Sequence, residues 1–219
     1  MTQHDQKNYK EHTWAKQVVQ IYNPIDAALE NLQHNYDTES KQIISVGRLT
    51  YLKNFELLAD IAKIVLKKHQ DWVWHIYGSG ESEASIRTKI MENGIEDRLE
   101  LKGHASNIYD VYKDYAMMIM TSRSEGFPMT LLEGMANKLP LVSFDIISGP
   151  NEIIREDENG FLIEPLNAQE MAEKINELIE NPEIRKEFSK NNIKYIDQYN
   201  LKSITEKWIS LFRNVLNKP

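Results

Sequence analysis

The feature that most constrains the fold is an apolar strand that ends in a polar turn and continues as a helix. Met117–Met120 are four consecutive apolar residues, a pattern typical of a buried strand, and Ser122–Phe127 follow as its exit loop. Pro128 is predicted in the first turn of the next helix, where a missing N–H costs nothing. This segment therefore predicts a strand and a helix joined by one short loop.

The same order of strand and helix recurs along the sequence. Alternating strands and helices favour a mostly parallel sheet that is covered on both faces. We therefore predict an α/β fold with a doubly wound, six-stranded sheet and additional C-terminal helices. The expected strands are residues 43–46, 72–77, 99–103, 117–120, 139–144 and 159–163. The expected helices are residues 55–66, 81–93, 108–115, 128–136, 150–154, 168–180, 182–199 and 201–216.

The start of the helix at Pro128 is a candidate anion site. The free amides of Phe127, Met129 and Thr130, together with the positive end of the helix dipole, would suit a phosphate. Glu125 lies just before this helix. Glu133 lies about 7.5 Å further along the helix axis than Pro128, which is roughly the step from a diphosphate to a ribose.

A second group of candidate phosphate ligands follows the first expected strand. Gly47, Arg48 and Lys53 belong to the loop at its carboxyl end, which is where open α/β sheets bind ligands. Arginine can bind two phosphate oxygens at once, whereas lysine contributes a compact positive charge.

The glycine-rich turn after the second expected strand does not match a dinucleotide fingerprint. Gly78-Ser79-Gly80 would need a third glycine at position 83, where the sequence has Glu83, so NAD binding is discounted. His75 alternates with apolar neighbours inside the strand, which indicates a histidine of the core. His104 follows the third strand, either as a cap of the strand end or as a ligand.

The segment from Glu125 to Glu133 has the form E-G-F-P-x-x-x-x-E. It resembles the E-x7-E signature of retaining glycosyltransferases with the GT-B fold, the glycosyl transferases group 1 type, and the resemblance extends from about residue 21 to 216. The G-R-L-x-x-x-K run at residues 47–53 and the N-P-x-D turn at residues 23–26 also match. Taken alone, the two glutamates could be solvated acids on an amphipathic helix. Gly126, Phe127 and Pro128 also match the signature at their positions, which argues against this alternative.

The resemblance implies roles for individual residues. Glu125 would face the donor sugar and is the candidate catalytic residue, and Glu133 would hydrogen-bond the ribose hydroxyls. Arg48 and Lys53 would hold the diphosphate, and backbone groups near Ala105 would contact the nucleobase. The candidate nucleotide-sugar-binding residues are Gly47, Arg48, Lys53, Gly78, Ala105, Glu125, Gly126, Phe127, Met129, Thr130 and Glu133.

The resemblance also divides the chain. A GT-B enzyme has two domains with the active cleft between them, and this sequence matches the donor-binding, Rossmann-like half. We expect a disordered or expression-derived tail (1–17), an interdomain linker with a strand and a helix (18–40), the donor domain (41–200), and a helix that crosses back to the acceptor domain (201–219). The sequence does not match the N-terminal acceptor domain. We therefore expect either that this chain is an excised piece or that a separate subunit provides the acceptor half. Apolar residues at helical spacing in the last helix are expected to pack in the core or between domains: Trp208, Ile209, Phe212 and Leu216.

The implied reaction is hexosyl transfer with retained configuration from a nucleoside-diphosphate sugar, expected to be a UDP-hexose or UDP-N-acetylhexosamine. The S-G-P-x-E-I-I run at residues 148–154 occurs in polysaccharide-building members, so the expected acceptor is a glycan or a lipid-linked glycan. The family needs no metal or other cofactor. The expected location is the cytoplasm or the inner face of the cytoplasmic membrane, with any membrane contact made through the acceptor domain. Without that domain, the chain alone is expected to be inactive.

Composition limits the other classes of function. A net charge of −7 disfavours nonspecific binding to nucleic acid or anionic lipid, and the absence of cysteine excludes disulfides and thiolate metal sites. No apolar run is long enough for a transmembrane helix. A glycoside hydrolase uses two carboxylates across the scissile bond and would not need phosphate-binding residues such as Arg48 and Lys53, which argues against this class. A sugar-nucleotide epimerase of the same fold and a noncatalytic nucleotide-binding module remain as alternatives.

Overall fold

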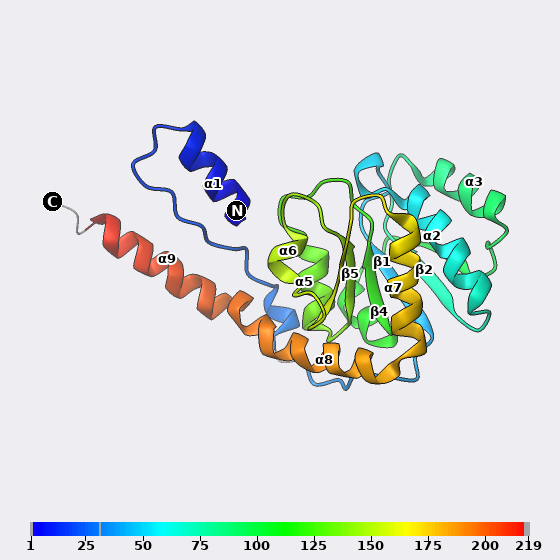
Figure 1. Ribbon diagram of the computed structural model, residues 1–219. Helices are drawn as coiled ribbons and strands as arrows, with labels where there is room; N and C mark the ends of the chain where they lie inside the picture. The colour runs from blue at the N-terminus through cyan, green and yellow to red at the C-terminus, as the bar shows by residue number, and fades with distance from the viewer. Residues whose placement is uncertain (1, 31, 217–219) are drawn as a thin grey trace.

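The computed structural model describes residues 2–30 and 32–216 and contains one six-stranded sheet (Figure 1). The strand order is β3-β2-β1-β4-β5-β6, and every pairing between these strands is parallel. The predicted doubly wound α/β fold is thereby confirmed. The strands are β1 (Gln42–Val46), β2 (Val73–Tyr77), β3 (Leu99–Gly103), β4 (Met117–Met120), β5 (Leu141–Phe144) and β6 (Gly160–Ile163).

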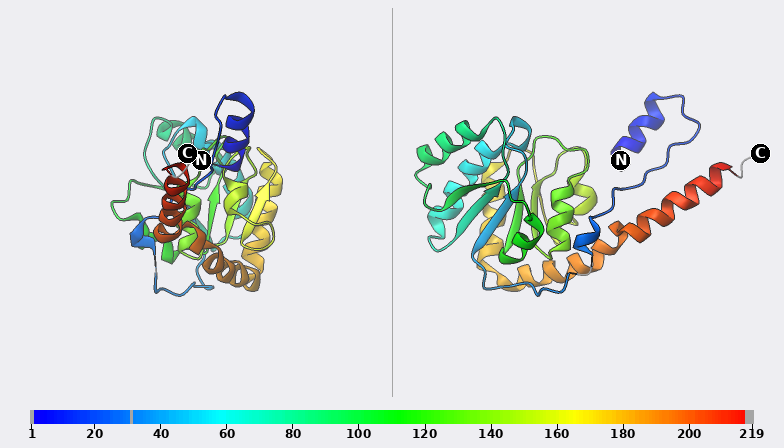
Figure 2. Two further views of the ribbon diagram at one scale, coloured as in Figure 1. Left: turned by 90° about the vertical axis from the view of Figure 1, so that its left-hand side faces the viewer. Right: turned by 180° about the vertical axis from the view of Figure 1, so that it is seen from behind.

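Helices cover both faces of this sheet, as Figures 1 and 2 show. Side chains of α2, α3 and α7 pack on one face, and those of α5 and α6 pack on the other. The α-helices are α1 (Gln3–His12), α2 (Phe55–Lys68), α3 (Glu83–Asn93), α4 (Ile108–Val111), α5 (Met129–Ala136), α6 (Pro150–Ile153), α7 (Ala168–Glu180), α8 (Pro182–Ile196) and α9 (Leu201–Leu216). Short 3-10 helices are η1 (Ala27–Leu29), η2 (Tyr51–Lys53), η3 (Tyr112–Asp114) and η4 (Asp197–Tyr199).

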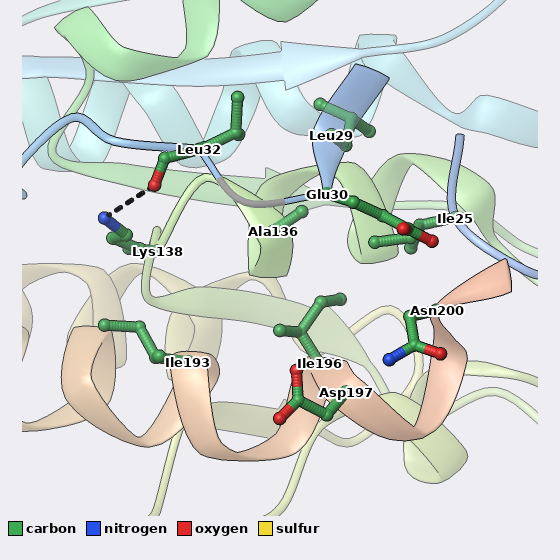
Figure 3. A pocket seen from close by; sticks show the side chains of 10 residues that line it. All are labelled: Ile25, Leu29, Glu30, Leu32, Ala136, Lys138, Ile193, Ile196, Asp197 and Asn200. Atoms are coloured by element: carbon green, nitrogen blue, oxygen red, sulfur yellow. Dashed lines mark hydrogen bonds between the residues drawn. The ribbon is translucent and has the colours of Figure 1, made fainter. Parts of the chain in front are cut away.

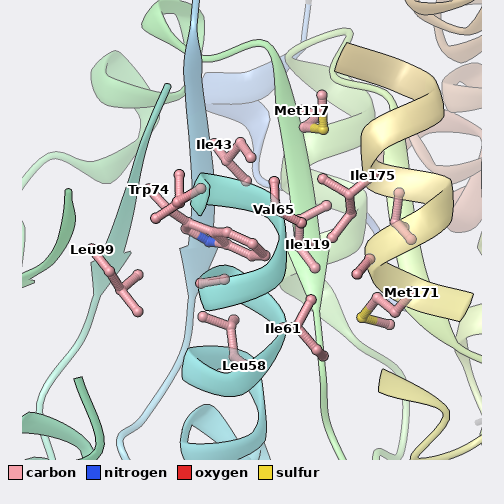
Figure 4. Close-up of a cluster of buried hydrophobic side chains, with 14 of the residues drawn as sticks. Ile43, Leu58, Ile61, Val65, Trp74, Leu99, Met117, Ile119, Met171 and Ile175 are labelled. Carbon is pink, nitrogen blue, oxygen red and sulfur yellow. The ribbon is translucent and has the colours of Figure 1, made fainter. Parts of the chain in front are cut away.

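The core on the α2 and α7 side is formed by apolar side chains from strands and helices (Figure 4). Trp74 of β2 is fully buried there, and its indole N–H donates to Ser45 Oγ at 3.1 Å. Ser45 in turn donates to the carbonyl of Ile119 at 2.7 Å, so this buried polar pair is satisfied. Strands that are buried on both faces must be apolar throughout, which explains why β4 and β5 contain almost no polar residues.

The strand order reverses between β1 and β4, which pair directly. The loops that leave these two strands lead to α2 and α5 on opposite faces of the sheet, and the carboxyl edge at such a reversal is the usual ligand position. Helix α5 lies close against β4, because a Cβ added to Gly134 would come within 2.7 Å of Met118 Sδ. This close packing fixes the position of α5 relative to β4.

The expected linker strand at residues 18–22 is wrong. This segment is extended but pairs with no strand of the sheet, and among the described residues of the expected linker only 27–29 are helical. Side chains rather than a β ladder hold the segment in place: Ile21 and Ile25 are buried, and the Ile25 amide donates to the carbonyl of Tyr199. A short apolar run thus packs as irregular chain and not as a strand of the sheet.

Residues 3–12 form α1, where the sequence analysis expects a tail without regular structure. The cause is a capping box at its start, in which Thr2 Oγ1 accepts the Asp5 amide and the Asp5 carboxylate accepts the Thr2 amide. No residue within α1 is buried. Local hydrogen bonds therefore define this helix more than packing does.

Helix α9 extends away from the sheet (Figure 2), and among its residues only Ile204 is buried. The expectation that its apolar residues belong to the core of this domain is wrong, because Trp208 is 44% exposed, Ile209 43% and Phe212 57%. Packing against a second domain remains a prediction. Residues 217–219 of the expected crossover helix lie outside the described residues.

Candidate functional site

The loops after β1, β2 and β3 pack backbone against backbone at the carboxyl edge of the sheet. The Gly47 amide donates to the carbonyl of Tyr77 at 3.0 Å, and the Gly78 amide donates to the carbonyl of Gly103 at 2.8 Å. Gly78 has φ +144°, and a Cβ there would lie 1.9 Å from the Gly47 carbonyl oxygen. Only glycine fits this position, which agrees with the predicted tight turn.

The start of α5 presents free amide groups, as predicted. Within the described chain, the amides of Phe127, Met129 and Thr130 have no hydrogen-bond acceptor. Pro128 itself precedes the helix as its N-cap, with φ −75° and ψ 95°, so its predicted place in the first turn is corrected by one residue. The amides and the helix dipole together make this end of α5 attractive to an anion.

Lys53 and Glu125 are brought into direct contact by the loops after β1 and β4. Lys53 Nζ lies 2.5 Å from Glu125 Oε1, and the two side chains are only 21% and 13% exposed. Ser122 Oγ donates to the same oxygen at 2.6 Å. The sequence analysis did not identify Ser122, although a hydroxyl three residues before a loop carboxylate is a pattern that could have indicated it.

Arg48, in the loop after β1, is exposed. Its guanidinium makes no hydrogen bond or ion pair with any part of the chain that the structure describes. Its charge is therefore available to a ligand, whereas the ammonium of Lys53 already has a carboxylate partner.

Glu133 lies further along α5 in a different environment. The hydroxyl of Tyr112 donates to Glu133 Oε2 at 2.6 Å. Burial raises the pKa of the Glu133 carboxyl and the negative charge of Asp26 raises it further, while the Tyr112 hydrogen bond and the charge of Lys53 lower it. Sequence reasoning missed Tyr112, because nothing in its local pattern indicates a contact with residue 133.

The loop after β5 packs on the E-G-F-P segment. Ser148 Oγ donates to the carbonyl of Gly126 at 3.1 Å. Gly149 has φ +104°, and a Cβ there would lie 2.4 Å from Pro128 Cδ. The β5 loop thus holds the segment through Gly126 and Pro128.

Residues of the segment predicted to be a linker also contact Glu125–Pro128, the E-G-F-P segment. Tyr22 stacks on Phe127 with ring centroids 5.0 Å apart and planes 17° from parallel, and Tyr199 packs against both rings. The Phe127 side chain is therefore part of an aromatic cluster, which leaves its backbone amide for a ligand. The sequence analysis missed Tyr22 as a neighbour of the candidate site.

The two histidines next to the strands differ. His75 is buried and its Nδ1 lies 2.7 Å from the hydroxyl of Tyr115, and burial lowers the pKa of its imidazole. This agrees with the prediction of a core histidine. His104 is exposed and Ala105 is half-buried in the loop after β3, which β2 separates from the loop after β1. The role of Ala105 near a nucleobase stays a prediction, and His104 stays either a cap of the strand end or a ligand.

A separate cavity of about 240 Å³ lies at the opposite end of α5 (Figure 3). Its walls come from the linker, α5 and α8, including Ile25, Ala136 and Ile196, and Lys138 donates from its rim to the carbonyl of Leu32. This cavity is therefore distinct from the candidate site.

No group of three or more potential metal ligands occurs among the described residues, and none of their helices is long and apolar enough to cross a membrane.

A family model described as glycosyl transferases group 1 matches residues 29–195. Among curated proteins, the chain is 34% identical over 187 residues to the poly(ribitol-phosphate) alpha-N-acetylglucosaminyltransferase of Staphylococcus aureus, covering 85% of this chain and 38% of that protein. It is 34% identical over 213 residues to the amylovoran biosynthesis glycosyltransferase AmsD of Erwinia amylovora, covering 95% of this chain and 59% of that protein.

Among solved structures, a mutant of S. aureus TarM in complex with Fondaparinux, alpha-GlcNAc-glycerol and UDP matches with a TM-score of 0.89 and 30% identity. The pneumococcal O-GlcNAc transferase GtfA in complex with UDP and GlcNAc matches with a TM-score of 0.82 and 27% identity. Each comparison covers 97% of this chain and 43% of the other. The chain thus spans less than two thirds of the length of these relatives.

Proposed function

Because the chain belongs to the glycosyl transferases group 1 family, we propose that it binds the donor of a retaining hexosyl transfer, a UDP-hexose or UDP-N-acetylhexosamine. The observation that carries this proposal is the convergence of Lys53, Glu125 and the first amides of α5 at the point where the strand order reverses. Relatives whose structures contain UDP, or UDP with GlcNAc, support this choice of donor.

The diphosphate is bound by positive charge from two loops. Arg48 offers a guanidinium with no competing partner in the described chain, and such a group can bind two phosphate oxygens at once. The ammonium of Lys53 has three N–H donors, so it can keep Glu125 as a partner and still donate to a phosphate. The free amides at the start of α5 complete the anion site.

Glu125 orients the donor sugar. Its Oε1 already accepts from Lys53 and Ser122, while Oε2 has no hydrogen-bond partner within the described residues. That second oxygen can accept a sugar hydroxyl without breaking either existing contact. Since both contacts fix the carboxylate, little orientational freedom is lost on binding.

The positive groups also lower the barrier. Negative charge develops on the leaving diphosphate as the bond to the sugar breaks, and Arg48, Lys53 and the α5 amides lie ready to stabilise it. Preorganised groups of this kind are commonly the largest catalytic contribution. The configuration of the sugar is retained in this proposal, with Glu125 as an orienting group rather than a nucleophile.

Transfer requires an acceptor-binding half, which in a GT-B enzyme lies across the cleft from the donor domain. We propose that the acceptor is a glycan or a lipid-linked glycan of polysaccharide biosynthesis. The activities of two relatives, the poly(ribitol-phosphate) and amylovoran enzymes, support this class. Any association with the cytoplasmic membrane would be made through that other half.

The first prediction tests the diphosphate site. Arg48→Ala and Lys53→Ala are each expected to weaken UDP binding by about 1.5 to 3 kcal/mol, the scale of hydrogen bonds to charged groups. Neither change should alter binding of uridine, which has no phosphate. Isothermal titration of both ligands measures the difference. Arg87→Ala on α3 serves as a control, because the Arg87 side chain pairs on the surface with Glu83 and with no other described residue.

Equal losses for UDP and uridine would refute the diphosphate assignment. Thermal-shift measurements with UDP, GDP and ADP test the base, because a bound ligand raises the unfolding temperature by mass action. A noncatalytic nucleotide-binding module would give the same binding results, so turnover with an acceptor half present separates it from a transferase.

A further inference from the structure

A buried tyrosine holds one oxygen of the second glutamate. The Tyr112 ring is fully buried beneath α5, and its hydroxyl donates to Glu133 Oε2 at 2.6 Å. A phenol fixed in this way is a donor of defined direction, because both of its side-chain torsions are locked by packing. Its partner Glu133 is attached to α5, which Gly134 holds close against β4.

The other oxygen of Glu133 is open. Within the described residues, Oε1 has no hydrogen-bond donor. One carboxylate oxygen is thus fixed by a protein donor, and the other can accept a ligand hydroxyl. A free carboxylate would have to be ordered when the ligand binds, and the Tyr112 contact removes that cost before binding.

We propose that Tyr112 is a positioning residue that orients the Glu133 carboxylate to accept a hydroxyl of the donor's ribose. This inference rests on the proposed function, in which Glu133 contacts the ribose. Tyr112 itself touches no donor atom in this scheme. Its effect passes entirely through Glu133 and should be absent when Glu133 cannot accept as a carboxylate.

The charged and titratable groups around Glu133 come from several elements. Tyr112 of η3, Lys53 of η2 and Asp26 in the turn before η1 all influence its pKa, and Tyr109 of α4 faces its charge. Burial raises the pKa of Glu133, and the Tyr112 hydrogen bond lowers it. Removing the hydroxyl therefore raises the pKa further, so that Glu133 becomes protonated at a higher pH.

The test compares UDP with 2′,3′-dideoxy-UDP, which lacks the ribose hydroxyls but keeps both phosphates. Because both ligands carry the same diphosphate, protonation of the phosphates changes both dissociation constants alike and cancels in their ratio. This ratio measures the preference for UDP. In Tyr112→Phe we expect this preference to fall about tenfold at neutral pH, the scale of a hydrogen bond to a charged group. As the pH is lowered, Tyr112→Phe should lose its preference for UDP over dideoxy-UDP at a higher pH than the wild-type chain does.

Further variants serve as controls. Tyr115→Phe removes another buried hydroxyl three residues away, which bonds to Tyr77 and His75 rather than Glu133, so the preference should stay unchanged. Glu133→Gln should remove the pH dependence. Glu133→Ala leaves no acceptor at this position, so adding Tyr112→Phe to Glu133→Ala should have no further effect on the preference. That double-mutant cycle separates positioning from a general loss of packing.

The outcomes distinguish the two proposals. If the wild-type chain binds neither ligand, the proposed function and this inference both fail. If it prefers UDP, and Tyr112→Phe keeps the same preference and the same pH midpoint, only the inference is overturned. If Tyr112→Phe does not fold, proton NMR of the wild-type chain decides: the Tyr112 hydroxyl resonance should move with UDP and not with dideoxy-UDP, and equal movement would overturn the inference.

Discussion

At the scale of residues, the two glutamates of the E-x7-E pattern have opposite surroundings. Glu125 contacts the ammonium of Lys53 and the hydroxyl of Ser122, next to the free amides of α5. Glu133 contacts the neutral phenol of Tyr112, and burial raises its pKa. Such different environments for two identical side chains are typical of sites that give them different roles.

A prediction follows for these two glutamates. Glu133→Ala should weaken UDP binding about tenfold, because it removes an acceptor for the ribose. Glu125→Ala should leave UDP affinity largely intact and reduce discrimination among UDP-sugars, because its open oxygen faces the sugar in the proposal. Isothermal titration with UDP and a set of UDP-sugars measures both effects. Loss of UDP binding in Glu125→Ala alone would show that the two roles are exchanged.

At the scale of elements, the site depends on loops whose backbones touch. The β2 loop approaches the β1 loop at Gly78, and the β5 loop approaches the start of α5 at Gly149. Both glycines have positive φ and leave no room for a Cβ. The elements thereby hold Arg48, Lys53 and Glu125 on a rigid edge rather than on free loops.

The corresponding prediction concerns Gly78→Ala. A Cβ at this position would lie 1.9 Å from the Gly47 carbonyl oxygen, so the free energy of unfolding should fall by about 3 kcal/mol or more. Gly103→Ala is the matched control: it has φ +70° but no atom within 4 Å of the added Cβ, so a loss of about 1 kcal/mol is expected. Urea unfolding measures both, and equal losses would contradict the steric argument.

At the scale of the whole molecule, the site lies open at the edge of a single sheet. The face of α9 with Trp208, Ile209 and Phe212 is exposed, and α9 extends away from the donor domain. An acceptor half packed against this helix would cover the apolar face, as predicted for a GT-B enzyme. The family match spans most of the described donor domain, while the relatives are considerably longer.

The prediction at this scale is that the chain binds UDP but transfers no sugar by itself. Without an acceptor site, the gain from holding both reactants in place is lost, and this gain can reach about 7 to 11 kcal/mol of the barrier. Adding an acceptor half, fused or as a separate chain, should restore turnover, measured as UDP release with a glycan acceptor. Robust transfer by residues 1–219 alone would contradict this view.

The sequence by itself determined the sheet, its helices and the candidate site segments. Apolar periodicity predicted all six strands within two residues at each end, because buried strands must be apolar on both faces. The motif at residues 125–133 located both glutamates, and glycine at position 78 marked a tight turn. These features depend on residues that are close together in the sequence, so the sequence alone is enough to predict them.

Only the tertiary structure decided how distant residues meet. The contacts of Lys53 with Glu125 and of Tyr112 with Glu133 join segments 72 and 21 residues apart, and no local pattern encodes them. The predicted strand at residues 18–22 failed because a strand needs a partner edge, and Tyr22 packs on Phe127 instead. The exposure of Trp208 was likewise not predictable, because helical spacing shows which residues share a face but not what covers it.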